Sequence, residues 1–155
     1  MILTESINPI GRLTLQLRDR KDVLMDEVAA NNSIVLTGRD LVALRFIGQG
    51  NPVSHVAVGT GAAPTDPGAT ANLGTELFRK AINPINLATD LTTTNDGKRK
   101  VVLSTDLDFN EANGALTEAG LFNAASNGVM YNRVVFPPVN KTLDFKLTLI
   151  WEITF

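Results

Sequence analysis

The sequence predicts a mainly β protein: an antiparallel β-sandwich or barrel-like sheet with one or two short helices in its N-terminal half. Three observations support this fold class. Several segments alternate hydrophobic and polar residues, which is typical of half-buried strands. Short turn motifs such as Asp96-Gly97 and Asn113-Gly114 separate these segments, as in β-hairpins. One segment, residues 37–48, instead repeats its hydrophobic residues at helical spacing.

The first part of the chain is expected to begin with a hairpin. Residues 11–18 alternate, with Leu13, Leu15 and Leu17 on one face, and therefore predict a strand. Residues 22–30 fit either a second, returning strand or a helix, because their Leu, Met, Glu and Ala residues also favour helices.

The predicted helix over residues 37–48 has recognisable ends. Thr37 followed by Asp40 resembles a capping box, with Asp in place of the more usual Glu. Gly48 and Gly50 mark the end of the helix. The hydrophobic residues that recur at helical spacing are Leu41, Leu44 and Ile47.

A buried strand and a long exposed loop are predicted next. Residues 53–61 have the composition of a short buried strand, and residues 60–72 are rich in Gly, Pro, Ala and Thr, as surface loops often are. Residues 73–82 fit either one or two helical turns or a strand, and Pro84 ends the segment. The candidate contact residues of the loop are Thr60, Thr65, Asp66 and Thr70.

From residue 86 onward the pattern predicts strands. The threonine-rich segment 87–94 favours a strand because Thr favours extended backbone. Pro137-Pro138 are expected to end the strand that precedes them. The other strands are predicted over residues 100–109, 115–123, 129–136 and 143–155.

The chain of 155 residues suits one domain. Residues 1–50, the hairpin and the helix, are a candidate docking or attachment segment, and residues 51–155 form a β-rich part. No shift in composition separates the two, so one continuous structural unit is expected, with its softest boundary between Gly48 and Pro52.

The composition argues against several classes of function. The chain has 14 basic and 16 acidic residues, a formal net charge of −2, which disfavours nucleic-acid binding. It has no cysteine, which rules out disulfides, thiolate metal sites and a cysteine nucleophile. Residues 1–13 lack the pattern of a secretory signal, and no stretch approaches the roughly 20 apolar residues of a membrane-spanning helix. Synthesis in a cytoplasm without membrane insertion is therefore expected.

No catalytic, cofactor or metal site is predicted. His55 is the only histidine, and its neighbours have the composition of a core strand, so a histidine at a strand end is favoured over a catalytic one. Asp106, Asp108 and Glu111 lie close together in the sequence but lack the spacing of an EF-hand loop. The chain is therefore expected not to be an enzyme.

Glu118 is the carboxylate most in need of a partner, because it lies inside the short apolar run 115–123. A half-buried carboxylate must be paired or hydrogen-bonded, and the planar guanidinium of arginine suits this task. If this segment pairs with the next strand, Glu118 and Arg133 lie on adjacent strands, and Arg79 is the alternative partner. Gly120 would permit a β-bulge or the close approach of another backbone. The structural ion-pair candidates are Glu76, Arg79, Glu118 and Arg133.

Several segments, taken in order, resemble a known group of proteins. The segments are NNSIVLTGRDLVA, HVAVGTGAAPTD, LGTELFRKAI, EANGALTEAGLFN, GVMYNRVVFPPVNKT and LTLIWEITF. Their order and spacing resemble small bacteriophage tail-associated structural proteins of the tail-fibre or baseplate kind, which also occur in phage-tail-like contractile particles. The resemblance covers most of the chain from about Asn31 onward.

The resemblance implies a virion structural protein of the phage tail, made in the host cytoplasm and without enzymatic activity or cofactor. It implies a homo-oligomer, with a trimer favoured because fibres commonly have that symmetry. Other tail or baseplate proteins are the expected partners, and a host surface receptor is a further one. An alternative is a carbohydrate- or surface-binding β-sandwich module that presents the loop of residues 60–72. The single Trp and single Tyr weaken this alternative, because aromatic platforms usually stack on sugars.

Overall fold

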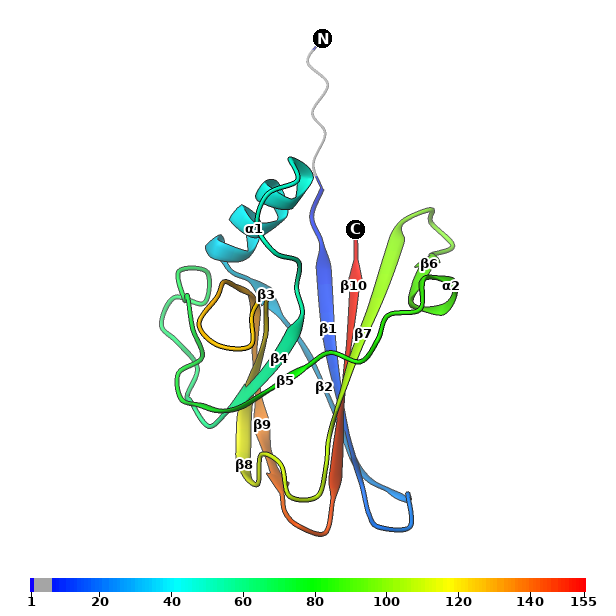
Figure 1. Ribbon diagram of the computed structural model, residues 1–155, viewed down its shortest axis with the longest axis vertical. Helices are drawn as coiled ribbons and strands as arrows, with labels where there is room; N and C mark the ends of the chain where they lie inside the picture. Colours follow the sequence, from blue (N-terminus) through cyan, green and yellow to red (C-terminus); the bar gives the residue numbers. More distant parts are fainter. Residues whose placement is uncertain (2–6) are drawn as a thin grey trace.

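The structure, a computed structural model, describes residues 1 and 7–155 and consists mainly of two antiparallel β-sheets (Figure 1). Each sheet has five strands, which confirms the predicted β-rich sandwich. The first sheet has the order β2-β1-β10-β7-β6. Its strands are β1 (Ile10–Arg18), β2 (Leu24–Asn31), β6 (Leu91–Thr93), β7 (Arg99–Leu107) and β10 (Lys146–Thr154).

The second sheet has the order β3-β9-β8-β4-β5. Its strands are β3 (Ser33–Ile34), β4 (His55–Gly59), β5 (Glu76–Ala81), β8 (Gly114–Phe122) and β9 (Met130–Lys141). Residues 22–30 and 73–82, which fitted either a strand or helical turns, thus contribute the strands β2 and β5.

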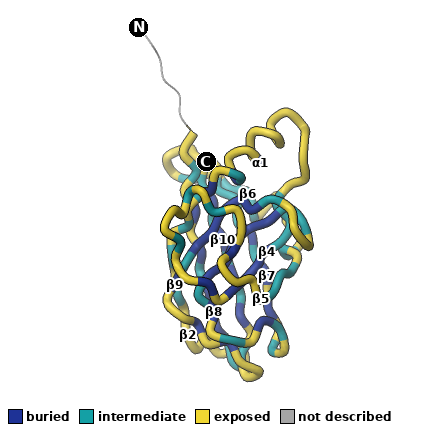
Figure 2. Tube along the Cα trace, turned by 90° about the vertical axis from the view of Figure 1, so that its left-hand side faces the viewer, coloured by how far each residue is buried: buried dark blue, intermediate teal, exposed yellow. Residues whose placement is uncertain are grey.

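The core lies between the two sheets and follows the predicted alternation. Leu13, Leu15 and Leu17 of β1 are buried, and they face the second sheet together with Trp151 of β10. β1 lies in the middle of the first sheet and pairs with β10 from Ile10 to Arg18. The hairpin of the first 50 residues is therefore an integral part of the same core as the rest of the chain. Figure 2 shows the buried residues along the strands and the exposed ones in the loops.

The helix α1 (Leu36–Phe46) lies across one end of the sandwich (Figure 1). Its predicted start is wrong: Val35 is the N-cap, and no side chain caps the helix. Thr37 instead donates its hydroxyl to the main-chain oxygen of Met130, at 2.8 Å, because the first turn packs on the start of β9. Gly48, with a φ of +75°, follows the helix end as expected.

Two further predictions differ from the structure. β9 continues through Pro137-Pro138 instead of ending before them. The pairing with β8 shifts register between Leu116 and Glu118, so that the prolines lie in a bulge where the sheet requires no N–H from them. The segment 87–94 is only partly a strand. Its first half is a helical turn, α2 (Leu87–Asp90), because Asn86 accepts a hydrogen bond from the N–H of Ala88 at 3.0 Å.

Candidate functional site

Glu118 and Arg133 form a buried ion pair in the second sheet. Glu118 lies on β8 with no exposed surface, and Arg133 lies on the neighbouring strand β9. Nε of Arg133 donates a hydrogen bond to the carboxylate oxygen Oε2 at 2.9 Å, and a terminal nitrogen of Arg133 lies 2.6 Å from the same oxygen. This is the pairing of adjacent strands that the sequence led us to expect. Arg79, the alternative partner, lies elsewhere.

Three backbone N–H groups complete the environment of Glu118. Gly61 and Thr75 donate to its Oε1 at 2.8 Å each, and Gly74 donates to Oε2 at 2.9 Å. Burial by itself raises the pKa of Glu118, but these N–H groups and Arg133 outweigh it and hold the pKa of the carboxyl below its ordinary value. The side chain is therefore an ionised anchor with every oxygen engaged, and it is poorly suited to exchange a proton.

Glu118 and Arg133 together hold both ends of the segment of residues 60–75, which contains the loop of residues 60–72 that was predicted to carry contacts. Arg133 also donates to the carbonyl of Ala62 at 2.8 Å. The hydroxyl of Thr117 donates to the carbonyl of Gly61 at 2.8 Å. A Cβ at Gly61 would overlap the carboxylate of Glu118, so only glycine allows this close approach.

The tip of this loop is ordered by its own turn. Oδ1 of Asp66 accepts hydrogen bonds from the N–H groups of Gly68 and Ala69, at 3.1 and 3.3 Å. The carbonyl of Gly68 accepts from the N–H of Leu36 at 2.9 Å, which ties the loop to the start of α1. Of the candidate contact residues, Thr60, Thr65 and Asp66 are exposed and Thr70 is half-buried.

Gly120 lies two residues after Glu118 on the same strand. The register irregularities of β8 lie on either side of it, between Leu116 and Glu118 and between Leu121 and Phe122. A Cβ at Gly120 would lie 2.9 Å from the main-chain oxygen of Asn132 on β9. Of the two roles expected for this glycine, the structure therefore shows the close approach of a neighbouring backbone.

Arg79 and Glu76 form a second, separate pair within β5, with Nε and a terminal nitrogen at 2.9 and 2.6 Å from the carboxylate. Arg79 also donates to the carbonyls of Ala124 and Asn127, at 3.0 and 2.8 Å, and it stacks on the ring of Phe122. Arg79 therefore holds the turn between β8 and β9. Glu76 is about one-third exposed, so this pair is more accessible to water than the Glu118 pair.

Lys141 is a buried cation that sequence reasoning missed. Its Nζ donates to the carbonyls of Asp108 and Phe109, at 2.8 and 3.3 Å, and to Oδ1 of Asn113 at 3.0 Å. Burial lowers the pKa of Lys141, and the nearby carboxylates of Glu111 and Asp108 partly counter this effect. A signal was available in the sequence, because alternation from the buried Val139 places Lys141 on the same inner face.

The remaining candidates for chemistry do not converge. His55 begins β4, and its Nδ1 is hydrogen-bonded to the hydroxyl of Ser54 at 2.8 Å. Glu111 pairs with Lys80 at 2.6 Å. Within residues 1 and 7–155, no three histidine or carboxylate side chains come together as metal ligands would. The helices in this part of the chain are too short and too polar to cross a membrane.

Comparison of the chain with protein-family models, with curated proteins and with solved structures gave no match. The ion pairs and the buried lysine connect neighbouring strands to the loops and turns at their ends. They fix the positions of these loops and turns relative to the strands.

Proposed function

We propose that the protein is a structural subunit of a phage tail, of the fibre or baseplate kind, that assembles as a homo-oligomer and docks to other tail proteins. The observation that carries the assembly proposal is the exposed hydrophobic surface of α1. We call the exposed hydrophobic surface of α1 the α1 patch, and its residues are Val42, Leu44, Phe46 and Ile47. The assignment to a phage tail rests on the sequence resemblance.

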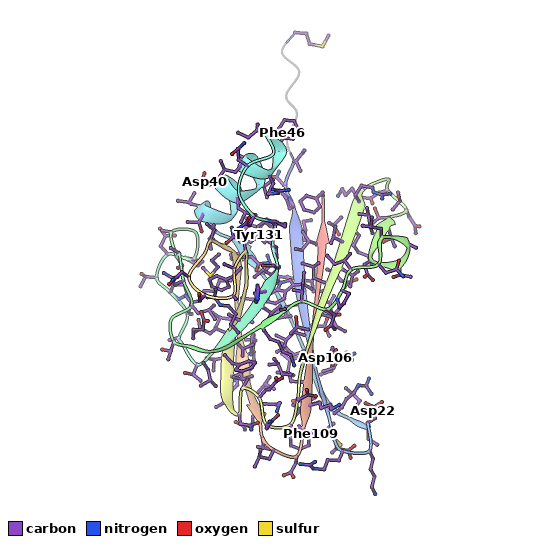
Figure 3. The ribbon with its side chains drawn as sticks, viewed as in Figure 1. Asp22, Asp40, Phe46, Asp106, Phe109 and Tyr131 are labelled. Atoms are coloured by element: carbon purple, nitrogen blue, oxygen red, sulfur yellow. The ribbon has the colours of Figure 1, made fainter. Side chains whose placement is uncertain are left out.

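The α1 patch is more hydrophobic than a solvated helix requires. Phe46 is 91% exposed and Ile47 is 65% exposed, and Figure 3 places Phe46 at the far end of the helix. Only Gly38 and Leu41 of the helix are buried. Leu44 and Ile47, which recur with Leu41 at helical spacing, are exposed. Exposed apolar patches on a protein surface mark interaction sites.

Covering the patch would stabilise an assembly substantially. Full burial of a side chain such as Phe, Leu or Ile contributes about 1.5–3 kcal/mol. The patch lies at the same end of the molecule as the start of β1 and the end of β10 (Figure 1). Association through this end would leave the turn between β9 and β10, at the opposite end, free for other contacts.

The oligomeric state in solution tests the proposal. Light scattering during size-exclusion chromatography should give the mass of an oligomer, a trimer being favoured, for the wild-type chain. Phe46→Asp should shift the chain to a monomer, because it places a charge on the most exposed side chain of the α1 patch while leaving the buried core untouched. The matched control is Leu143→Asp, since Leu143 is 60% exposed but lies in the turn at the opposite end.

The two variants distinguish the outcomes. An oligomer that Phe46→Asp dissociates and Leu143→Asp leaves intact supports assembly through α1. A wild-type chain that remains monomeric at high concentration, or an oligomer unaffected by Phe46→Asp, contradicts it. Circular dichroism of both variants should match the wild type, because neither side chain is part of the core.

A second candidate function, binding to a carbohydrate or another surface component, is favoured by one observation. The loop of residues 60–75 is held at both ends by buried charges, so its tip is presented in a single conformation. Binding to a glycan array that is lost on Thr65→Ala and Asp66→Ala would support this function. Binding that survives both changes, or no binding to any glycan, would argue against the loop as a receptor site.

A further inference from the structure

The turn between β8 and β9 contains Asn127-Gly128, one of the two Asn-Gly dipeptides of the chain. Both residues have a positive φ, +52° for Asn127 and +73° for Gly128, and tight turns with this backbone conformation favour Asn followed by Gly. A Cβ at Gly128 would lie 2.7 Å from the Cβ of Ala124 and 2.7 Å from Oδ1 of Asn123. The fold therefore requires glycine directly after Asn127.

This dipeptide is chemically reactive, and both of its reacting groups are free. In an Asn-Gly dipeptide the nitrogen of the glycine can attack the side-chain carbonyl carbon of the asparagine, because no Cβ hinders the approach. Asn127 and Gly128 are both exposed. The side-chain amide of Asn127 forms no hydrogen bond with the described residues, and the N–H of Gly128 donates none to them.

The other Asn-Gly dipeptide, Asn113-Gly114, is held in place. Oδ1 of Asn113 accepts a hydrogen bond from Nζ of Lys141 at 3.0 Å, and Nδ2 of Asn113 donates to the carbonyl of Phe109 at 3.1 Å. The amide of Asn113 must give up these hydrogen bonds before its carbonyl carbon can turn toward the nitrogen of Gly114. The chain thus contains a free and a held copy of the same reactive dipeptide.

Arg79 lies at the reactive peptide bond. One of its terminal nitrogens donates to the main-chain oxygen of Asn127 at 2.8 Å. This oxygen takes up negative charge when the nitrogen of Gly128 loses its proton. A hydrogen bond from a guanidinium therefore stabilises the deprotonated peptide bond, which is the attacking species. Glu76 and the carbonyl of Ala124 hold the guanidinium in this position.

We propose that Asn127 is a modification site, at which it converts spontaneously to isoaspartate with the help of Arg79. The nitrogen of Gly128 loses its proton to solvent and forms a bond to Cγ of Asn127. The side-chain amide takes up a proton and leaves as ammonia, which produces a cyclic imide. Water then adds to the main-chain carbonyl carbon of residue 127, the bond from this carbon to the nitrogen of Gly128 breaks, and the carbon becomes a carboxylate.

The position of Arg79 favours isoaspartate over aspartate as the product. In isoaspartate the main chain runs through the former side chain, and the oxygen that Arg79 binds becomes part of the free carboxylate. The neutral hydrogen bond is thus replaced by a stronger, charge-assisted one. In aspartate the new carboxylate lies on the side chain instead, and the oxygen bound by Arg79 stays a peptide oxygen.

Peptide mapping of the folded chain after incubation in mildly alkaline buffer tests the proposal. Cleavage after glutamate places Asn113 in residues 112–118 and Asn127 in residues 119–152. Fragmentation in a mass spectrometer locates each amide that has become an acid, and a protein isoaspartyl methyltransferase labels isoaspartate. We expect Asn127 to react at least about tenfold faster than Asn113, because the amide of Asn113 must first break a hydrogen bond to a charged group.

Incubation in urea is the reference for both sites. Without the fold the two dipeptides should react at similar rates, and the share of isoaspartate at residue 127 should be lower than in the folded chain. Arg79→Gln should slow the reaction of Asn127 severalfold in the folded chain but not in urea, whereas Arg79→Lys, which keeps the charge, should retain part of the effect. Asn113 reports on folding in the same sample, since it becomes reactive when the fold is lost.

Preferential conversion of Asn127 to isoaspartate in the folded chain, slowed by Arg79→Gln, supports the proposal. Equal rates at Asn113 and Asn127 in the folded chain, or no reaction of Asn127 there, overturn it. It is also overturned if folding does not raise the share of isoaspartate, a test that holds even if Arg79→Gln fails to fold, or if Arg79→Gln reacts like the wild type while Asn113 stays protected. Phe46→Asp should be modified at the wild-type rate, because this reaction does not depend on the proposed assembly.

Discussion

Replacing Glu118 with glutamine tests whether the buried carboxylate is an anchor of the fold. Glutamine has nearly the same shape, but it has one acceptor oxygen and no charge. Oε1 of Glu118 accepts hydrogen bonds from Gly61 and Thr75, and Oε2 accepts from Gly74 and from Nε of Arg133. If the glutamine oxygen takes the place of Oε2, it still accepts hydrogen bonds from Gly74 and Arg133. The NH2 group then takes the place of Oε1 and faces the N–H groups of Gly61 and Thr75.

The expected cost follows from these lost contacts. Each buried donor left without an acceptor costs about 1–3 kcal/mol. Breaking a buried ion pair from one side costs roughly 3–5 kcal/mol, because Arg133 then remains buried without a counter-charge. The two costs describe largely the same lost contacts and are therefore not added. They predict a loss of about 3–5 kcal/mol in the free energy of unfolding.

Urea unfolding followed by the fluorescence of Trp151, the only tryptophan, measures this loss in the core itself. The matched control is Glu76→Gln, because Glu76 also approaches an arginine to 2.6 Å but is about one-third exposed. It should cost less than about 1 kcal/mol, as more exposed pairs do. Equal losses for Glu118→Gln and Glu76→Gln, or a loss below about 1 kcal/mol for Glu118→Gln, would refute the reasoning.

Two further predictions concern the buried charges. The pKa of Glu118 is lower in the folded than in the unfolded chain, so its contribution to stability is complete above the unfolded value, about 4.5, and is lost as the pH falls through the folded value. Acid unfolding of the wild-type chain, followed by circular dichroism, should therefore begin in this pH range. The stability of Glu118→Gln should depend less on pH there. Parallel pH profiles of stability for the wild type and Glu118→Gln would contradict this prediction. Lys141→Met should lower the free energy of unfolding, measured in urea, by roughly 2–4 kcal/mol, because it leaves several carbonyl oxygens without a donor. Lys98 is exposed, and Lys98→Met should change the free energy of unfolding by less than about 0.5 kcal/mol. Similar effects of the two lysine substitutions would show that the buried ammonium does not support the fold.

The pairing of Glu118 with Arg133 could be predicted from the sequence because both residues lie on neighbouring strands joined by a short turn. The rest of the environment of Glu118 could not. Its three N–H donors come from Gly61, Gly74 and Thr75, more than 40 positions away in the chain. Local alternation reports which face of a strand is buried, but it does not report which loop covers that face.

The helix α1 shows a different limit of prediction from the sequence. Its spacing correctly predicted a helix, but of the three hydrophobic residues that recur at this spacing only Leu41 is buried, whereas Leu44 and Ile47 are exposed. The first turn is held by β9 and the loop, and the rest extends beyond the end of the sandwich (Figure 2). Helical periodicity identifies the apolar residues of a helix, but it cannot say whether they are covered by the same chain or by another one.

The measurement that tests the central proposal most directly is the distance between copies of the chain at the end of α1. Because the chain has no cysteine, Gln49→Cys introduces one thiol beside the α1 patch, and Asp144→Cys introduces one in the turn between β9 and β10. Spin labels on Gln49→Cys should show dipolar coupling between chains, which an excess of unlabelled chain and the additional change Phe46→Asp both abolish. Labels on Asp144→Cys should be farther apart. The absence of coupling at position 49, or equal distances at the two positions, would contradict assembly through α1.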